Sequence, residues 1–496
     1  IHAAPRLVTS GAVLVPTPRQ PKGPVAIHAP LSLRTVMIPP RSSTTRHRGS
    51  RGRALLLVAA LCLPALVDAQ TTGAAITAAD LRRRLFLVAD DSMGGRATGS
   101  RGNYQSAEYI AREFKRLGLR PAGDDGTYFQ TVPFFRLRAD SASQLMAGAA
   151  TLQMGRDFIV ALARSIPRPL DGKRVVYGGA LDDSSTWIAA DSARDRVVVL
   201  SAPSGATFRT TFLLNQTRRF QEAVTVAVPI LESFPSELAA SQQAGRVTID
   251  TMRTASAPGR LFITTAAAER FLGRPLAGTA PGTLGEVMHG AGTVSYQPLP
   301  YAARNVVAVL PGRDPRRAGT YVSLTSHNDH VGFDSAPVDH DSLRALQRVT
   351  RPLGADSPAR EPTAAEWASI RATLDSLRRL RPPRLDSIRN GADDDGSGTV
   401  VMLEIAEALA SARVRPARSV LFVSHAAEEE GLLGSRWFTD HPTVPRDSIV
   451  SEFDMDMVAR GNAIDLAEGS PTYLELIGSR RLSREYGALI DAANAR

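Results

Sequence analysis

Apolar runs of strand length alternate with helical patterns in the second half of the chain, and this alternation restricts the possible folds. A helical pattern is predicted over TVVMLEIAEALA, and two more over 76–118 near the start. Strands alternating with helices favour an α/β fold, here a doubly wound mixed sheet flanked by helices. The predicted strands are NVVAVLP (305–311), YVSLT (321–325), RSVLFVSH (418–425) and SIVSEFDMDMV (448–458).

Acidic residues and histidines lie where these apolar runs end or where the helix begins. An α/β sheet carries its chemistry at the carboxyl ends of its strands, so these side chains are expected to meet. Imidazole and carboxylate groups are ligands for zinc. The sequence therefore predicts a metal site. Its candidates are His327 and Asp329 in TSHNDHVG, Asp394 in NGADDDGSG, Glu428 and Glu429 in HAAEEEGLLGS, and Asp456 in FDMDMVARG.

Two further histidines lie near the first of these motifs. His330 and His340 could compete as ligands, and we predict that they lie outside the coordination sphere or on the surface.

The triple aspartate of GADDDGSG has two interpretations. Three adjacent carboxylates repel one another and need a cation or water. Five residues also fit positions 1, 3, 5, 6 and 12 of a calcium-binding loop, in which position 6 is the glycine of a sharp turn. Against this, Pro382 and Pro383 weaken the entering helix that such a loop requires. The five residues are Asp393, Asp395, Ser397, Gly398 and Glu404.

Taken together, the order His-x-Asp, Asp, Glu-Glu, Asp resembles the dizinc exopeptidases of peptidase family 28 in metallopeptidase clan MH. This family includes bacterial leucyl aminopeptidases, aminopeptidase Y, glutamate carboxypeptidase and glutaminyl cyclases. The resemblance covers about 76–140 and 303–475, within a catalytic domain assigned to 76–140 and 303–496. The related cytosolic exopeptidases have a similar ligand order, but the Gly-Ala-Asp-Asp and Ala-Ala-Glu-Glu contexts disfavour them.

The resemblance implies a ligand set for two Zn²⁺ ions. His327, Asp394 and Asp456 would bind one zinc, and Asp394 would bridge to a second zinc held also by Glu429. The family takes the last ligand of the second zinc from a histidine far downstream. Because the last histidine printed is His441, we expect that ligand beyond residue 496, in a segment that a C-terminally truncated chain lacks.

The resemblance also implies a reaction. Glu428 would be the general base that activates a zinc-bridging water, and Asp329 would orient His327. The expected function is that of a metallo-aminopeptidase acting on peptide substrates. A carboxypeptidase or glutaminyl cyclase of the same fold, or a non-catalytic peptidase-like binding protein with an incomplete metal site, are the alternatives.

The positive charge of the chain is concentrated in a leader. Residues 1–53 contain nine Lys or Arg and no Asp or Glu, so a net charge of +10 for the whole sequence leaves +1 for residues 54–496. This distribution argues against nucleic-acid binding. The apolar stretch 54–69 is predicted to be a signal peptide cleaved after Ala69. We therefore expect export to the periplasm or the extracellular space, without a stable membrane anchor.

Two insertions are predicted in the catalytic domain. Residues 145–300 contain short β-type runs, among them RVTIDTM (246–252), separated by Gly, Pro, Ser and Asp. They resemble the protease-associated domain often inserted in this family. Residues 341–389 form a charged, arginine-rich helical insertion. Its charge is most simply a solvated face, and a lid beside the site is the alternative.

Overall fold

The computed structural model describes residues 72–140, 143–162, 166–203, 219–233, 244–249, 256–352, 360–459 and 476–495. The predicted leader, 1–53, and the predicted signal peptide, 54–69, lie outside these residues. Within the described ranges, no helix combines the length and the apolar character that a membrane span requires.

A six-stranded mixed sheet forms the centre of the fold. Its strand order is β1 (Arg120–Pro121), β16 (Arg304–Leu310), β20 (Ser419–His425), β17 (Tyr321–His327) and β21 (Ile449–Asp454), and β2 (Phe129–Thr131) pairs with β16. Strand β17 runs parallel to both β20 and β21, whereas β16 is antiparallel to β20. The carboxyl ends of β17, β20 and β21 therefore meet at one edge of the sheet.

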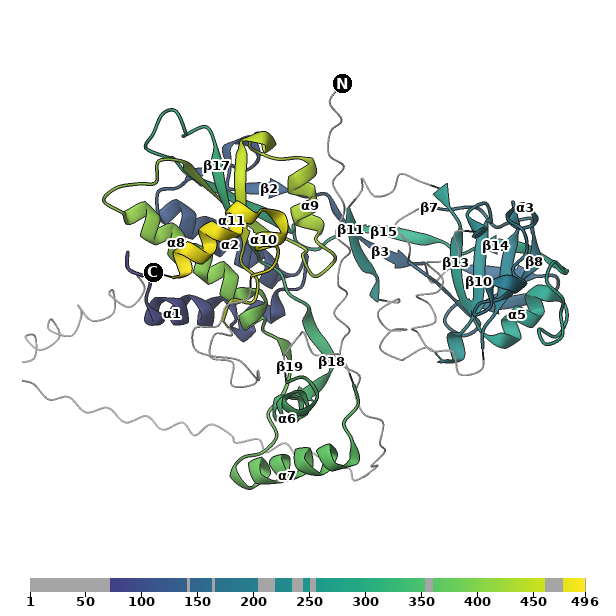
Figure 1. Ribbon diagram of the computed structural model, residues 1–496. Coiled ribbons are helices and arrows are strands. Elements are labelled where there is room, and N and C mark those ends of the chain that lie inside the picture. The colour runs from purple at the N-terminus through teal and green to yellow at the C-terminus, as the bar shows by residue number, and fades with distance from the viewer. Residues whose placement is uncertain are drawn as a thin grey trace, which may run out of the picture. The chain divides into compact units, whose positions relative to one another are not determined.

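Helices cover both faces of this sheet. Helices α1 (Ala78–Val88), α2 (Arg101–Arg116) and α8 (Gly398–Ser411) pack on one face, where Figure 1 shows α2 and α8 beside the sheet. The other face packs against Phe438 of α9 (Leu433–Asp440). Alternate residues of β16 enter the two cores, since Val306 lies in one and Val307 in the other. The predicted mixed sheet flanked by helices is confirmed.

Capping residues mark the ends of the two N-terminal helices. The Thr77 side chain accepts a hydrogen bond from the Asp80 amide and caps α1. Gly118 follows α2 at φ +70°, a conformation that favours glycine. Between the helices, the glycine-rich segment forms a 3₁₀ turn, η1 (Asp91–Arg96).

A second, eight-stranded sheet lies within residues 144–291. The strands β8, β9, β10 and β13 are parallel neighbours, and Val197, Val199 and Ala227 pack in its core. The helices α3 (Ala190–Ala193) and α5 (Thr265–Leu272) connect its strands. The sheet order is β5 (Ala150–Gln153), β4 (Gln144–Ala147), β14 (Leu284–Ala291), β8 (Lys173–Ala180), β9 (Val197–Ser201), β10 (Thr225–Pro229), β13 (Gly259–Ile263) and β6 (Phe158–Val160).

The run RVTIDTM, predicted as a strand of this region, belongs to a different sheet. It forms β11 (Arg246–Ile249), which pairs with β3 (Phe134–Ala139), and β15 (Val294–Pro298) lies on the other edge of β3. A short parallel pair joins β7 (Ile166–Pro167) and β12 (Ser256–Ala257). The β-rich character predicted from the sequence is thus distributed over several sheets.

Residues Asp341–Pro382 belong to a different compact unit from the one that contains the six-stranded sheet. It contains α6 (His340–Thr350), except its first residue, and α7 (Ala364–Leu380). The Asp341 carboxylate, buried in this unit, pairs with Arg378 and Arg381 of the α7 end. In the other unit, β18 (Gly332–Asp339) and β19 (Leu385–Arg389) form an antiparallel pair.

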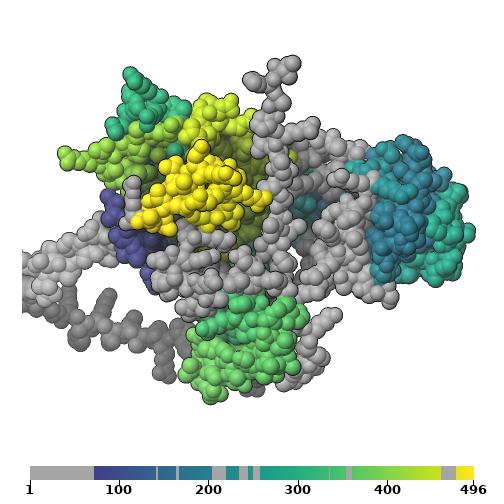
Figure 2. Space-filling model, viewed as in Figure 1, coloured from purple at the N-terminus to yellow at the C-terminus, as the bar shows by residue number. Residues whose placement is uncertain are grey.

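The described chain ends with two helices, α10 (Ser479–Leu482) and α11 (Arg484–Asn494). The Tyr486 hydroxyl lies 2.8 Å from that of Ser451, and the Tyr486 ring packs on Phe453, so α11 lies against β21. Most of α11 is solvent-exposed, and it forms part of the yellow surface in Figure 2.

Candidate metal centre

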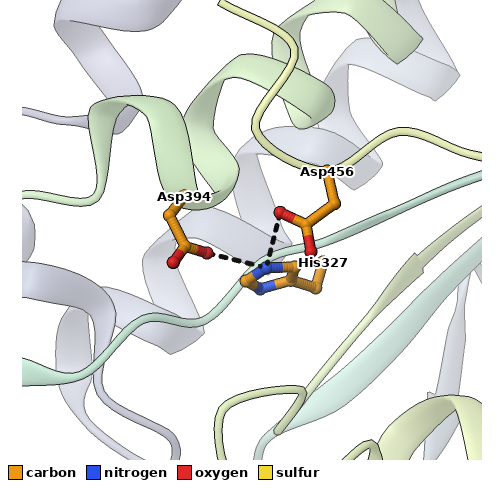
Figure 3. Close-up of side chains that lie close together, drawn as sticks. All are labelled: His327, Asp394 and Asp456. Atoms are coloured by element: carbon orange, nitrogen blue, oxygen red, sulfur yellow. Dashed lines mark ion pairs between the residues drawn. The ribbon is translucent and has the colours of Figure 1, made fainter. Parts of the chain in front are cut away.

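The sheet edge brings together His327, Asp394 and Asp456, as Figure 3 shows. His327 is the last residue of β17, Asp394 lies in the turn that opens α8, and Asp456 follows β21. His327 Nε2 lies 3.1 Å from Asp394 Oδ1 and 3.8 Å from Asp456 Oδ1. Residues 129 positions apart in the sequence therefore form one cluster that could hold a metal ion.

A second cluster shares Asp394 with the first and adds His330 and Glu429. His330 Nδ1 lies 2.5 Å from Glu429 Oε1 and 3.9 Å from Asp394 Oδ1. The structure buries the His330 ring within this cluster at 12% exposure, so His330 is not a surface residue. His340, by contrast, is 46% exposed, as predicted.

Glu428 belongs to neither cluster and lies beside the first. Its Oε2 atom is 3.9 Å from His327 Nε2. Burial raises the pKa of Glu428 to about 7, and the neighbouring carboxylates of Asp329, Glu429 and Asp456 add to this, while His327 opposes it. A carboxyl group of this kind is suited to accept a proton near neutral pH.

Asp329 is fully buried behind these residues. Its carboxylate accepts hydrogen bonds from the Thr98 hydroxyl and from the backbone amide of Glu428, both at 3.0 Å. The nearest partner of His327 Nδ1 is the backbone carbonyl oxygen of Asp329 at 3.1 Å, whereas the Asp329 carboxylate lies at 3.7 Å. Asp329 therefore holds the Glu428 backbone as well as the His327 ring.

The carboxylates of the first cluster favour a positive charge on His327. Burial lowers the pKa of His327, but the close carboxylates of Asp329, Asp394 and Asp456 outweigh it, and the pKa is raised well above its ordinary value. In this state a proton occupies the place that a cation would take. Metal binding at this position is consequently expected to weaken as the pH falls.

Asp395 points the opposite way from its neighbour Asp394. Its carboxylate is buried and accepts backbone N–H bonds from His327 at 3.0 Å and from Gly398 at 2.8 Å. The Thr399 hydroxyl donates to the His327 carbonyl at 2.9 Å. The start of α8 thus fixes the end of β17, and with it the position of His327.

The calcium-loop interpretation is wrong for this structure. Glu404, which would supply the ligand at position 12, accepts a hydrogen bond from Arg84 at 2.6 Å inside the helical core. Both oxygens of Asp395 are taken by backbone amides. The helical packing of α8 therefore carries Glu404 away from the aspartates.

Arg96 is a positioning residue that no sequence pattern marks. It lies in the glycine-rich segment between α1 and α2, yet it is fully buried. Its guanidinium donates to the carbonyl oxygens of Val88, Asn390 and Gly391 at 2.6 to 2.9 Å. Gly391 has a φ of +59°, and a Cβ there would lie 2.7 Å from both Arg96 Nη2 and His330 Cγ.

Loss of the Arg96 guanidinium should weaken metal binding. Arg96→Met would remove the guanidinium donors from the carbonyls of Asn390 and Gly391 and loosen the turn that presents Asp394. We expect zinc affinity to fall by about 10- to 100-fold, as for other partners behind metal ligands. Isothermal titration with Zn²⁺ measures this, with the exposed Arg101→Met as the matched control. Unchanged affinity in Arg96→Met would contradict the positioning role.

The donor set fits zinc by its chemistry and spacing. Zinc bonds to nitrogen and oxygen are about 2.0 to 2.2 Å long, so two ligand atoms on one tetrahedral ion lie about 3.4 Å apart. The separations of 3.1 and 3.8 Å around His327 Nε2 bracket this value. His327 Nε2, His330 Nδ1 and Glu429 Oε1 are also buried without a hydrogen-bond partner. Such atoms are expected to face a cation.

Comparison with known proteins identifies this part of the chain. Residues 305–485 match the model of peptidase family M28. The chain carries a peptidase family M28 domain. The family resemblance predicted from the motifs is confirmed, and the M28 domain contains both clusters and Glu428.

Similar proteins match over short segments. Aminopeptidase NAALADL1 of Rattus norvegicus is 37% identical over 99 residues, which are 19% of this chain and 13% of that protein. Aminopeptidase YwaD of Bacillus subtilis is 36% identical over 118 residues, or 20% of this chain and 25% of that protein. The matches thus span a quarter or less of these relatives.

One solved structure similar to this chain is that of BSAP, a zinc aminopeptidase from Bacillus subtilis. It is 16% identical and has a TM-score of 0.36, and the match covers 78% of this chain and 70% of that one. A TM-score this low leaves the functional interpretation to the site residues themselves.

Proposed function

We propose that this protein is a zinc-dependent aminopeptidase. The observation that carries the proposal is the pair of clusters that share Asp394, with the carboxyl group of Glu428 beside them. The aminopeptidases among the similar proteins support the same class of reaction. The ligands of one zinc would be His327, Asp394 and Asp456, and Asp394 and Glu429 would hold a second.

Zinc, when bound, would supply Lewis acidity that polarises the scissile carbonyl and lowers the pKa of water. Glu428 would accept the proton of the attacking water and then donate it to the leaving amine. A cation nearby favours the carboxylate form that this role requires, so the pKa of about 7 would fall on metal binding. Asp329 would hold Glu428 in place through its backbone amide.

Substrates with free or blocked termini test this proposal. With the full-length protein, aminoacyl p-nitroanilides with a free amino group should be hydrolysed, and their N-acetylated forms should not. A chelator should abolish hydrolysis, and Zn²⁺ should restore it. Cleavage of N-acetylated peptides from a free carboxyl end would favour a carboxypeptidase instead. Peptide binding by the zinc-loaded protein without hydrolysis would favour the non-catalytic alternative.

We further propose that the protein acts after export, on peptides in the periplasm or outside the cell. The support is the basic leader over 1–53 and the apolar stretch over 54–69. Mass spectrometry of the exported protein should find a mature N-terminus at Gln70.

For the β-rich segment 145–300, we propose a protease-associated-like module that shapes substrate access to the metal site or binds a partner.

A further inference from the structure

The second cluster contains a histidine that the family resemblance did not assign to it. The resemblance places the histidine of the second zinc far downstream. Among the described residues, His330 occupies that cluster together with Asp394 and Glu429, and their ligand atoms all lie within 4.8 Å of one another. We propose that His330 binds the second metal ion through Nδ1. This inference rests on the proposed function, because it assumes a metal-dependent site.

The atoms of His330 and Glu429 face each other without forming a hydrogen bond. His330 Nδ1 and Glu429 Oε1 are 2.5 Å apart, and both are buried and without a hydrogen-bond partner. An imidazole nitrogen without a proton and a carboxylate oxygen are both acceptors, so two such atoms at this distance repel each other unless a cation lies beside them. A cation there would satisfy both atoms at once.

The spacing of the three ligand atoms suits a single zinc. The separations of 2.5 Å to Glu429 Oε1 and 3.9 Å to Asp394 Oδ1 lie on either side of the about 3.4 Å expected between ligands on a tetrahedral ion. Binding of one zinc would require Glu429 Oε1 to move about 1 Å away from His330 Nδ1. Glu429 and Asp394 are 21% and 33% exposed, so they retain room to adjust.

The backbone around His330 is fixed by the same residues that fix Asp394. The His330 amide donates to the Arg96 carbonyl at 3.1 Å, and the Arg96 side chain binds the carbonyls of Asn390 and Gly391. The ring packs so closely on Gly391 that a Cβ there would lie 2.7 Å from His330 Cγ. A single buried arginine therefore sets the distance between His330 and Asp394.

A different role for His330 would be to donate a hydrogen bond to Glu429 and orient it. Partners of that kind contribute about 10- to 100-fold to metal affinity and do not change the number of ions bound. A ligand, in contrast, determines whether the second ion binds. The number of bound ions therefore separates the two roles.

The test is a titration of the metal-free, full-length protein with Zn²⁺ alone, followed by calorimetry and elemental analysis. We expect two ions per wild-type chain, one per His330→Ala chain, and an unchanged affinity for the remaining ion. His340→Ala, which removes an exposed histidine ten positions away, should still bind two. Two ions in His330→Ala, with the weaker affinity lowered by no more than about 100-fold, would overturn the assignment.

Two further results keep this test interpretable. If the wild-type protein binds no zinc, the proposed function fails, whereas two ions in wild type and in His330→Ala refute only the role of His330. If His330→Ala does not fold, a crystal structure of the zinc-loaded wild-type protein decides. Anomalous scattering should place the second ion about 2.0 to 2.1 Å from His330 Nδ1. A second ion bound without His330 would overturn the proposal.

Discussion

Replacement of Glu428 by glutamine should lower kcat for peptide hydrolysis by about 10²- to 10⁴-fold, the usual contribution of a positioned general base. Glutamine has nearly the same shape but cannot take up a proton at neutral pH. Zinc should remain bound, because Glu428 lies in neither cluster of potential ligands. Steady-state kinetics with an aminoacyl p-nitroanilide, together with zinc content, measure both effects.

Glu430→Gln is the matched control for this variant. Glu430 lies two residues further along, and its carboxylate accepts the backbone amide of Val247, an interaction that glutamine can also make. This control should keep its activity and its zinc. A Glu428→Gln protein as active as the control would show that another group accepts the proton. A loss of zinc would instead make Glu428 a ligand.

Replacement of Arg84 by methionine should destabilise the fold by about 3 to 5 kcal/mol, the cost of removing one partner from a buried ion pair. The guanidinium is 2% exposed and contacts Glu113, Glu404 and Glu407, each at 2.6 Å. Methionine fills the space but leaves these carboxylates of α2 and α8 without that donor. Urea unfolding monitored by circular dichroism measures the change.

Protonation limits the cost of this substitution. Burial already raises the pKa of Glu404, and Arg84 opposes that rise. Without Arg84, Glu404 is expected to take up a proton. The loss of folding stability in Arg84→Met should therefore be smaller at lower pH. Arg82→Met, on the exposed side of α1, is the control and should change stability by less than about 0.5 kcal/mol. Equal stability of the two variants would contradict a structural role for the network.

The main elements of the fold are predictable from hydrophobic patterns. The apolar runs that became β16, β17, β20 and β21 are long enough and sharply enough bounded to be strands. The sheet buries β16 and β20 on both faces, whereas β21 lies at its edge and is largely exposed. The pattern did not reveal which strands are neighbours. RVTIDTM has the composition of a core strand but pairs with β3, because strand pairing depends on contacts distant in the sequence.

Four of the metal-site candidates could be identified from the sequence because each lies next to a strand or helix end. Parallel β17, β20 and β21 bring those ends to one edge, so His327, Asp394, Glu429 and Asp456 lie together. Local sequence also marks the acidic turn before α8 as a place that needs a cation.

Only the tertiary structure decided which of several neighbouring residues belong to the metal site. Asp394 faces the clusters while Asp395, the next residue, turns back to bind the His327 amide. His330 and Arg96 enter the site through irregular backbone, where no period relates sequence position to side-chain direction. The contacts that place them join residues almost 300 positions apart. The sequence by itself therefore determined the strands, the helices and the chemical nature of the site. Packing between distant segments determined which residues form it.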